Sequence, residues 1–283
     1  MTLREVVLDA TKQLVASHDL QATAARDAEV LLLHAFQISR ATLLAHPDRE
    51  VSAVELALYG SSIARRLRNE PIQYIVGEQE FYGLALRVTP AVLIPRPETE
   101  HLVEAVLGLL PRDRALRILD VGTGSGAIAI ALAVHLPQAE MTAVDLSAAA
   151  LEIATANVRA HGVEGRIRLL KSDLLGAVVG ERFDVVVSNP PYIPESDRSS
   201  LHAQVREYEP VTALFAGASG LDIYERLIPQ AHAVLVHGGL LAMEIGCGQR
   251  EAITALLKGW EDVRFVNDLQ GIPRVTLAKR ADY

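Results

Sequence analysis

The sequence predicts an α/β protein in which a mostly parallel, seven-stranded sheet follows an amino-terminal helical bundle. Three observations predict this class. Short apolar runs alternate with helical segments from residue 97 onward, which is typical of a parallel sheet covered on both faces. Before residue 70, apolar residues recur three and four positions apart, which predicts helices. A hydrophobic content of 50% in 283 residues can fill the cores of two domains.

The amino-terminal elements come first along the chain. Helical spacing of apolar residues marks three segments in residues 1–70, and Asn69-Glu70-Pro71 breaks the last of them. Residues 73–88 alternate as an extended hairpin does, with Gly83 near its turn. We therefore expect a helical domain in residues 1–70, a linker with a β-hairpin in residues 71–95, and the sheet domain in residues 96–283.

The sheet domain begins with a helix from Pro97 to about Leu110, because a proline and acidic residues suit the first turn of a helix. Helices are also expected at Ala127–Val134 and Ala148–His161. The last two strands come close together, so one of them is expected to be antiparallel. The seven expected strands are Leu116–Val121, Glu140–Leu146, Arg166–Lys171, Phe183–Ser188, Leu240–Ile245, Val263–Val266 and Arg274–Ala278.

Composition limits the classes of partner. The net charge of −8, from 35 acids against 27 bases, works against a broad surface for nucleic-acid backbones. A run of arginines, Arg65, Arg66 and Arg68, could still touch RNA, but an exposed helix face is the commoner explanation of such a run. The single cysteine, Cys247, excludes an intrachain disulfide, and we expect it to be a small packing residue.

Targeting and membrane signals are not apparent in the sequence. The first 20 residues mix acids with apolar residues at helical spacing, unlike a signal peptide. The longest apolar run, Ala127–Val134, falls far short of the roughly 20 residues that a membrane-spanning helix needs. We expect a soluble cytoplasmic protein without a membrane partner.

A glycine-rich turn follows the first strand of the sheet. Residues 119–127 read Leu-Asp-Val-Gly-Thr-Gly-Ser-Gly-Ala, a strand, a turn and the start of a helix. Glycines let the backbone approach a ligand, and ligands bind at the carboxyl ends of parallel strands. We therefore expect the cofactor to contact Gly122, Thr123, Gly124, Ser125 and Gly126.

The glycine turn alone does not identify the cofactor. Gly122, Gly124 and Ala127 also satisfy the dinucleotide fingerprint, and Asp145, which closes the second strand, can accept ribose hydroxyls of either NAD or S-adenosylmethionine. Two acids favour S-adenosylmethionine. Asp120 could hold an ammonium group, and Asp173 ends the third strand where an adenine amine would lie, although Asp173 could equally cap a turn.

The motif Ser188-Asn189-Pro190-Pro191-Tyr192 ends the fourth strand, at the same edge of the sheet. Prolines there could simply terminate a strand. However, an amide or ring amine has a delocalised lone pair, and two rigid acceptors would orient its hydrogens against an activated methyl group. We expect the Asn189 side-chain oxygen and the Pro190 carbonyl to be those acceptors, with Pro191 stiffening the loop and Tyr192 packing on the planar group.

The motifs together resemble the HemK/PrmC family, S-adenosylmethionine-dependent methyltransferases that modify the glutamine of the Gly-Gly-Gln motif in class 1 peptide chain release factors. The resemblance runs from about residue 70 to the end, and the helical amino terminus resembles the family's substrate-docking domain in kind. It is carried by residues 71–77, Phe81-Tyr82-Gly83, residues 93–100, the glycine turn, residues 189–193, Glu209-Pro210, Ala213-Leu214, Gly220-Leu221, Glu244-Ile245-Gly246, Gln249, Asp268, Gly271 and Arg274.

This resemblance implies a class I, Rossmann-like methyltransferase that N5-methylates glutamine in release factors during translation termination, with S-adenosyl-L-methionine as cofactor and no metal. By the same resemblance, Gly122–Gly126 and Asp145 bind the cofactor, Asn189 touches both cofactor and substrate, and Pro190, Pro191 and Tyr192 complete the glutamine site. One residue departs from the pattern: Leu174 stands where some relatives have an aromatic residue, so adenine would pack on an aliphatic side chain. Arg96, Glu98 and Thr99 are expected to order the loop over the site, although helix capping also explains Glu98 and Thr99.

Other functions share parts of this pattern. The motif at residues 189–192 also resembles that of adenine-N6 DNA methyltransferases, but the chain is acidic and has no evident insert for reading bases. A ribosomal RNA or ribosomal protein methyltransferase is a nearer alternative. A cofactor-binding scaffold or an NAD-dependent oxidoreductase would leave residues 188–192 without a role. No direct contact with nucleic acid is expected.

Overall fold

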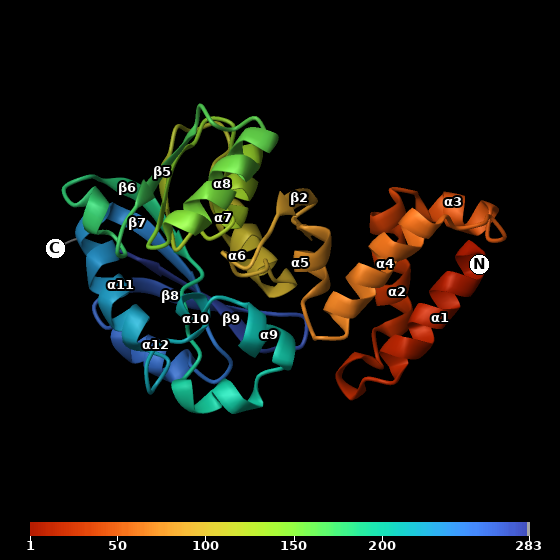
Figure 1. Cartoon of the computed structure of the whole chain (residues 1–283). Helices are drawn as coiled ribbons and strands as arrows, with labels where there is room; N and C mark the ends of the chain where they lie inside the picture. Colours follow the sequence, from red (N-terminus) through yellow and green to blue (C-terminus); the bar gives the residue numbers. More distant parts are fainter. Residues whose placement is uncertain (282–283) are drawn as a thin grey trace. The chain divides into compact units, whose positions relative to one another are not determined.

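The computed structural model describes residues 1–281, which divide into two compact units (Figure 1). Unit 1 contains Met1–Glu78 together with Leu201–Tyr208, and unit 2 contains Gln79–Ser200 and the chain from Glu209 onward. Residues 201–208 group with unit 1, whereas the helical domain predicted from the sequence contained residues 1–70 only. Among the described residues, no helix has the length and apolar character needed to cross a membrane.

Unit 1 is helical, as the spacing of its apolar residues predicts. Capping boxes begin two of its helices: the side chains of Thr2 and Ser52 accept from the backbone N–H groups of Glu5 and Glu55, whose carboxylates accept in return. Leucines on the facing sides of these helices form one core. The helices are α1 (Leu3–Val15), α2 (Ala24–Phe36), α3 (Arg40–Ala45), α4 (Ala53–Arg66), α5 (Ile72–Val76) and α9 (Ala203–Tyr208).

The prediction of an exposed arginine face was wrong for Arg66. Its side chain is 2% exposed, and its Nε donates to Asp27 at 2.7 Å. The neighbouring Arg65 donates to Glu70 at 2.8 Å. Arginine can enter a helical core when a carboxylate balances its charge, and a run of basic residues does not reveal such a partner.

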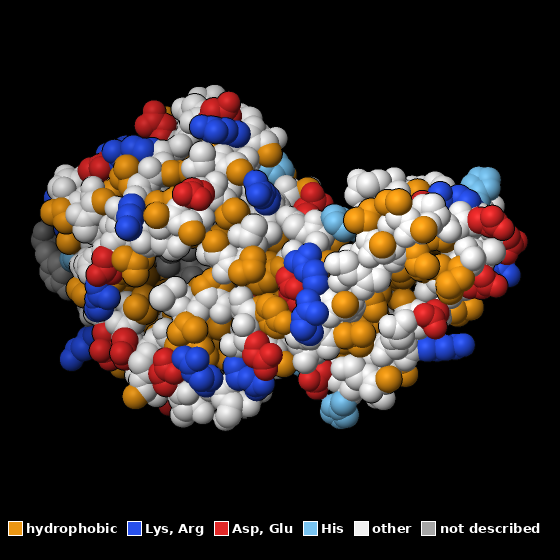
Figure 2. Space-filling view, in the orientation of Figure 1, with side chains coloured by type: hydrophobic (Ala, Val, Ile, Leu, Met, Phe, Trp, Pro, Cys, Tyr) orange, Lys and Arg blue, Asp and Glu red, His pale blue; other side chains and the backbone are white. Residues whose placement is uncertain are grey.

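Several apolar side chains of unit 1 remain exposed at helical spacing. Val54 and Leu58 lie one turn apart on α4 and are 71% and 54% exposed. Leu8 and Val15, on α1, are 54% and 43% exposed. Hydrophobic side chains are correspondingly visible on this unit in Figure 2, where charges of both signs are scattered among them.

Unit 2 holds the sheet, whose strand order is β5-β4-β3-β6-β7-β9-β8. The five strands β3 to β7 are parallel, and β9 pairs antiparallel with both β7 and β8, as the close spacing of the last two strands predicts. From β3 the chain adds β4 and β5 on one side and then β6 and β7 on the other, so the strand order reverses between β3 and β6. The strands are β3 (Arg117–Val121), β4 (Glu140–Asp145), β5 (Ile167–Lys171), β6 (Phe183–Ser188), β7 (Leu235–Glu244), β8 (Glu261–Asn267) and β9 (Pro273–Lys279).

A hairpin of β1 (Glu78–Phe81) and β2 (Leu84–Arg87) precedes the sheet. Its turn is Tyr82-Gly83, where both residues have positive φ, as a tight hairpin requires. The expected extended run from residue 73 was too long, because residues 72–76 form α5 and Gly77 ends it with φ +82°. Alternation over so short a segment does not separate a strand from a single helical turn.

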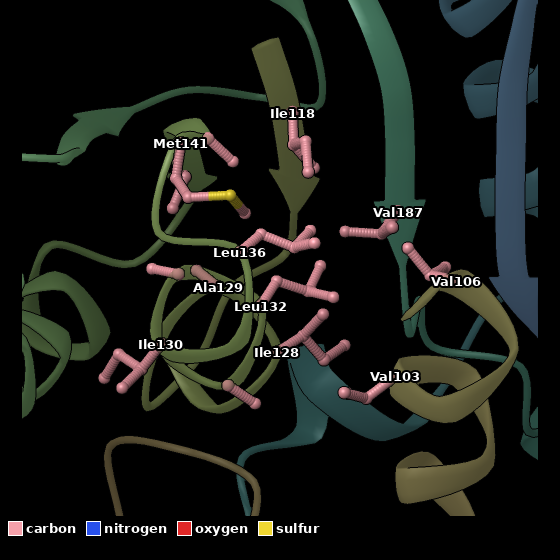
Figure 3. Packing of buried hydrophobic residues seen from close by; sticks show 14 of the residues in the cluster. Val103, Val106, Ile118, Ile128, Ala129, Ile130, Leu132, Leu136, Met141 and Val187 are labelled. Carbon is pink, nitrogen blue, oxygen red and sulfur yellow. The ribbon is translucent and has the colours of Figure 1, made fainter. Parts of the chain in front are cut away.

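Helices cover both faces of the sheet (Figure 1). On one face, α6 (Pro97–Leu107), α7 (Ala127–His135) and α8 (Ala148–Ala160) cover the sheet. Residues 127–133 of α7 are apolar on every side, and neighbouring strands and helices bury them (Figure 3). On the other face lie α11 (Asp222–Val234) and α12 (Arg250–Leu256). α11 was not predicted from the sequence, since it carries Pro229 inside an otherwise amphipathic pattern, and neither were α12 and the short α10 (Val211–Leu214).

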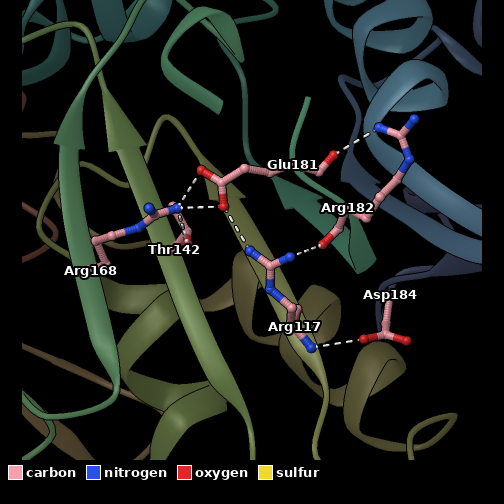
Figure 4. Close-up of polar contacts among 6 residues, drawn as sticks. All are labelled: Arg117, Thr142, Arg168, Glu181, Arg182 and Asp184. Carbon is pink, nitrogen blue, oxygen red and sulfur yellow. Dashed lines mark hydrogen bonds and ion pairs between the residues drawn. The ribbon is translucent and has the colours of Figure 1, made fainter. Parts of the chain in front are cut away.

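The amino ends of the strands are joined by an ion-pair network (Figure 4). Glu181, just before β6, accepts from Arg117 of β3 and from Arg168 of β5, each at 2.7 Å. Hydrogen bonds from Arg168 hold the pKa of Glu181 below its ordinary value. The backbone N–H of Arg117 also donates to Asp184. This polar network lies at the edge opposite the carboxyl ends, so it supports the sheet without entering a site there.

Candidate active site

A cavity of about 450 Å³ opens at the carboxyl ends of the parallel strands in unit 2. Its size is typical of a site for a small-molecule ligand. Its position, where β3 and β6 lie side by side and the strand order reverses, is where open α/β sheets bind ligands. It is lined by residues of six segments: 91–99, 121–128, 144–150, 172–174, 189–191 and 210–226.

The glycine turn forms one wall. Gly122 and Gly124 have φ of +74° and +55°, and a Cβ built on either would meet no atom of the described residues within 4 Å. Side chains at these positions would therefore project into open space where a ligand can approach the backbone. Gly126 acts differently, because its Cβ would lie 3.0 Å from Ile130 and 3.5 Å from Ala154 of α8. Gly126 thus serves helix packing, and it does not line the cavity.

Asp120 lies beneath this turn and is fully buried instead of lining the cavity. Burial is the main cause that raises the pKa of Asp120 to about 7, and the nearby charge of Asp145 also raises it. The hydroxyl of Thr123, which donates to Oδ2 at 2.6 Å, lowers the pKa and so opposes this shift. The backbone N–H of Ala129 also lowers the pKa of Asp120. Within residues 1–281, Oδ1 of Asp120 has no hydrogen-bond partner. A buried carboxylate of this kind suits a cationic group.

Asp145 lines the cavity at the end of β4. Its Oδ2 accepts from the backbone N–H of Gly124 and its Oδ1 from that of Ser147, each at 2.8 Å. A carboxylate has about four acceptor positions, so these two bonds fix its orientation and leave lone pairs for two ligand hydroxyls. This arrangement fits a ribose.

Asp173 and Leu174 line the cavity after β5. Asp173 accepts from Arg226 of α11 at 2.7 Å. Arg226 also lines the cavity, and it was not predicted from the sequence. Leu174 has φ +48°, a left-handed conformation that a leucine adopts at a cost of about 1 kcal/mol or more. Strain of this kind persists where the surroundings require it. Here it places an aliphatic side chain on the cavity wall.

Asn189 lines the cavity directly after β6, and Ser188 fastens that strand end to β3 by donating to the carbonyl of Val121 at 2.7 Å. The Asn189 Nδ2 donates to the hydroxyl of Thr99 at 3.0 Å. That hydroxyl in turn donates to Oε2 of Glu244 at 2.5 Å. The bond to Thr99 leaves the side-chain oxygen of Asn189 available to a ligand.

Glu244 ends β7 and is 2% exposed. Burial raises its pKa to about 7, while the hydrogen bonds from Thr99 and Tyr192 oppose that shift. The hydroxyl of Tyr192 donates to Oε1 at 3.3 Å, and burial holds the pKa of Tyr192 well above its ordinary value. Tyr192 therefore keeps its proton and holds Glu244 in place through this hydrogen bond. It does not line the cavity, and neither does Pro190, whereas Pro191 does.

Gln249 holds the backbone of residues 189–192, the proline segment, through hydrogen bonds of its side chain. Its amide Nε2 donates to the carbonyls of Tyr192 at 3.0 Å and Gly220 at 3.3 Å, and its Oε1 accepts from the N–H of Gly246 at 2.9 Å. Gly220 has φ +75°, and a Cβ there would lie 2.3 Å from the carbonyl oxygen of Tyr192. One side chain thus ties three loops at the strand ends.

An ion pair between a half-buried arginine and a buried glutamate joins two walls of the cavity. Arg96, which lines the cavity before α6, donates to Glu209 at 2.5 Å, and the carboxylate of Glu209 is 1% exposed. Burial raises the pKa of Glu209, and the charge of Arg96 opposes the rise. The pair holds residues 91–99 against the segment that begins at Pro210.

Some supporting residues have no signal in a single sequence. Asn157 of α8 is buried and donates to the carbonyls of Ser125 and Arg87, so it supports the glycine turn. Its place in an ordinary helical pattern concealed this role. Cys247 was expected to be a packing residue, but it is exposed. Within residues 1–281, no cluster of three or more His, Cys, Asp or Glu side chains is placed to hold a metal ion.

Comparisons with known proteins match the whole length of the chain. A family model described as the PrmC N-terminal domain matches residues 5–77, and one described as the methyltransferase small domain matches residues 99–206. A release factor glutamine methyltransferase of Koribacter versatilis is 46% identical over 99% of both chains. One of Geobacter sulfurreducens is 42% identical over 97% of this chain and 95% of its own.

The fold also matches solved methyltransferases. A methyltransferase of Pyrococcus furiosus superposes with a TM-score of 0.52 at 19% identity, covering 79% of this chain and 100% of its own. At this identity the likeness concerns the fold, a class I, Rossmann-like methyltransferase sheet of seven strands. The fold predicted from the sequence, including the helical amino terminus and the hairpin, is confirmed.

Proposed function

The chain belongs to the release factor glutamine methyltransferase family, and from that premise we propose how its own residues perform the reaction. The enzyme is an S-adenosylmethionine-dependent protein-(glutamine-N5) methyltransferase. Its substrate is a class 1 peptide chain release factor, methylated at the glutamine of the Gly-Gly-Gln motif. Since release factors act on ribosomes, we place this activity in the cytoplasm.

The cavity residues fit the cofactor. Gly122 and Gly124 leave room for a ligand against the backbone, and Asp145 keeps lone pairs for ribose hydroxyls. Asp120 lies beneath the turn and outside the cavity lining, and we expect its buried carboxylate, one oxygen of which has no partner among residues 1–281, to attract the ammonium of the methionine part. Leu174 would pack on the face of the adenine ring, and Asp173 would accept a hydrogen bond from the adenine amine. When bound, S-adenosylmethionine supplies an electrophilic methyl group on a sulfonium.

Asn189 carries the proposal for the substrate. It lines the same cavity as the glycine turn, and its Nδ2 is bound to Thr99, so its oxygen can accept from a substrate N–H. Pro190 does not line the cavity, but it lies between two residues that do, and we expect its carbonyl to accept the second N–H of the glutamine carboxamide. Two such bonds orient the nitrogen lone pair and stabilise positive charge that develops on nitrogen as the new bond forms. Pro191 stiffens the loop and lines the cavity, whereas Tyr192 lies outside the cavity lining and supports the site through its hydrogen bond to Glu244.

Unit 1 is the proposed docking surface for the release factor, in keeping with a helical substrate-docking domain at residues 1–70. Its match to the PrmC N-terminal domain model supports this role. Exposed apolar side chains on α4, Val54 and Leu58, offer contact area for a protein partner better than for a phosphate backbone. The hairpin linker at residues 71–95 and the domain from residue 96 onward complete the proposed organisation.

The direct test is methylation of intact release factor with labelled S-adenosylmethionine, read by mass spectrometry at the Gly-Gly-Gln glutamine. Asn189→Ala is expected to lose at least about 100-fold in turnover while cofactor binding persists, because it removes an acceptor that acts on the reacting nitrogen. Asn267→Ala, the same change at an exposed position of β8, is the matched control. Methylation of ribosomal RNA or DNA without methylation of release factor would reject the substrate.

A further inference from the structure

A chain of three side chains runs from the buried end of β7 to the cavity. Glu244 accepts from the Thr99 hydroxyl at 2.5 Å, and that oxygen accepts from the Asn189 Nδ2 at 3.0 Å. Thr99 is 4% exposed and sits in the first turn of α6, whereas Asn189 follows β6. Three separate elements therefore meet at one hydroxyl group.

The direction of these bonds follows from what each group can donate. An ionised carboxylate only accepts, so the bond between Thr99 and Glu244 uses the single hydroxyl proton of Thr99. The 2.5 Å separation is typical of a hydroxyl bonded to a carboxylate. The other oxygen of Glu244 accepts from Tyr192, whose hydroxyl is protonated. Because the hydroxyl proton of Thr99 is used in the bond to Glu244, its oxygen can only accept a hydrogen bond from Asn189.

An amide that faces an acceptor must present its NH2 group. Asn189 therefore turns Nδ2 toward Thr99, and its oxygen is directed away from that bond. The opposite rotamer would set NH2 against the substrate carboxamide, where two donors would face each other. The two orientations have almost the same shape, so packing alone does not select between them.

We propose that Thr99 and Glu244 are positioning residues that select the productive orientation of the Asn189 amide. The inference rests on the proposed role of Asn189 and adds the residues that set its polarity. The N-cap of α6 is Arg96, so helix capping does not explain why residue 99 is a threonine. The bonds to Glu244 and Asn189 give a reason for its hydroxyl.

The kinetic test uses the full chain at pH 8.5, where Glu244 is ionised. Thr99→Val keeps the side-chain shape but removes the hydroxyl, and we expect kcat for release factor to fall roughly 10- to 100-fold, the usual cost of a misplaced group. The affinity for S-adenosylmethionine should change little. Thr99→Ser restores the hydroxyl and should recover most of kcat. Glu244→Gln, which can donate to Thr99, should lower kcat by roughly 10-fold while it fills the same space.

The matched control is Thr276→Val, the same substitution at a 1% exposed position of β9. The hydroxyl of Thr276 has no partner within the described residues, so this change should leave kcat unaltered. Equal kcat values for Thr99→Val and the parent enzyme would overturn the inference. So would an equal loss in Thr99→Val and Thr99→Ser, because the hydroxyl would then be irrelevant.

A measurement without substrate separates this inference from the proposed function. The side-chain NH2 signal of Asn189, identified by its loss in Asn189→Ala, is followed by nitrogen-15 NMR. Thr99→Val should shift the signal and speed its hydrogen exchange, while Thr99→Ser and Thr276→Val should leave it in place. An unchanged signal in Thr99→Val refutes the orientation, whatever the enzyme methylates. If the signal shifts but release factor is not methylated, only the proposed function fails.

Discussion

Replacing Asp120 with asparagine should make the protein more stable and its cofactor site weaker. Burial raises the pKa of Asp120 from 3.8 to about 7, so ionising it inside the folded protein is unfavourable. The difference of about 3 pKa units, at about 1.36 kcal/mol each, corresponds to about 4 kcal/mol at most. Asparagine removes this cost while its oxygen still accepts from Thr123.

The effect depends on pH with a definite sign. Below pH 3.8 the carboxyl is neutral in both the folded and the unfolded chain, so it contributes no difference. Between pH 3.8 and about 7 the unfolded chain releases the proton while the folded chain keeps it, and the stability of the parent protein falls as pH rises. Above pH 7 the loss is complete. The advantage of Asp120→Asn should therefore be small at pH 4 and largest at pH 8.

The assay is urea denaturation of the cofactor-free proteins at both pH values, with Asp113→Asn, an exposed position, as control. Calorimetry should show that the Asp120→Asn variant binds S-adenosylmethionine roughly 10- to 100-fold more weakly, as loss of a charged hydrogen bond of about 1.5–3 kcal/mol implies. Binding to the parent enzyme at pH 6.5 should release protons, because a cation beside Asp120 lowers its pKa. The reasoning is refuted if the stability advantage is equal at pH 4 and pH 8, or if cofactor affinity is unchanged.

Three further outcomes are expected. Gly220→Ala should lower both stability and kcat, because its Cβ would lie 2.3 Å from the Tyr192 carbonyl and displace the proline segment; thermal unfolding and turnover would check this. Glu181→Gln should cost about 1 kcal/mol or less in urea unfolding, with an effect that shrinks in 1 M salt, since its partners Arg117 and Arg168 are about half exposed. A double change of Val54 and Leu58 to aspartate should raise KM for release factor several-fold and leave cofactor affinity unaltered, as separate titrations would show; equal losses would argue against docking on this unit.

The sequence predicted the parts of this fold that have local signals. Strands such as Phe183–Ser188 were found at their exact bounds because apolar, β-branched runs end at clear breakers. By contrast, α11 was missed because Pro229 interrupts its pattern, and Arg66 was misplaced because its partner lies 39 positions away. Short-range pattern carries no information about such pairings.

The candidate site shows the same division. The glycine turn and Asn189 were placed at neighbouring strand ends, and they line one cavity. The supports behind them are different in kind. Glu244 and Gln249 were noticed only as parts of a resemblance, and Asn157 was not noticed at all, because each acts through contacts between distant segments. The roles assigned to individual site residues remain predictions for the experiments above.

The bond between Thr99 and Glu244 joins residues 145 positions apart, and this has a consequence for biosynthesis. A growing polypeptide that has left the ribosome as far as β6 already carries the glycine turn, Asp145 and Asn189 itself. It still lacks Glu244, which arrives only with the end of β7. Partial products and prematurely ended chains would thus carry an asparagine whose amide has no fixed direction, and competence to act on release factors would come only with nearly complete synthesis.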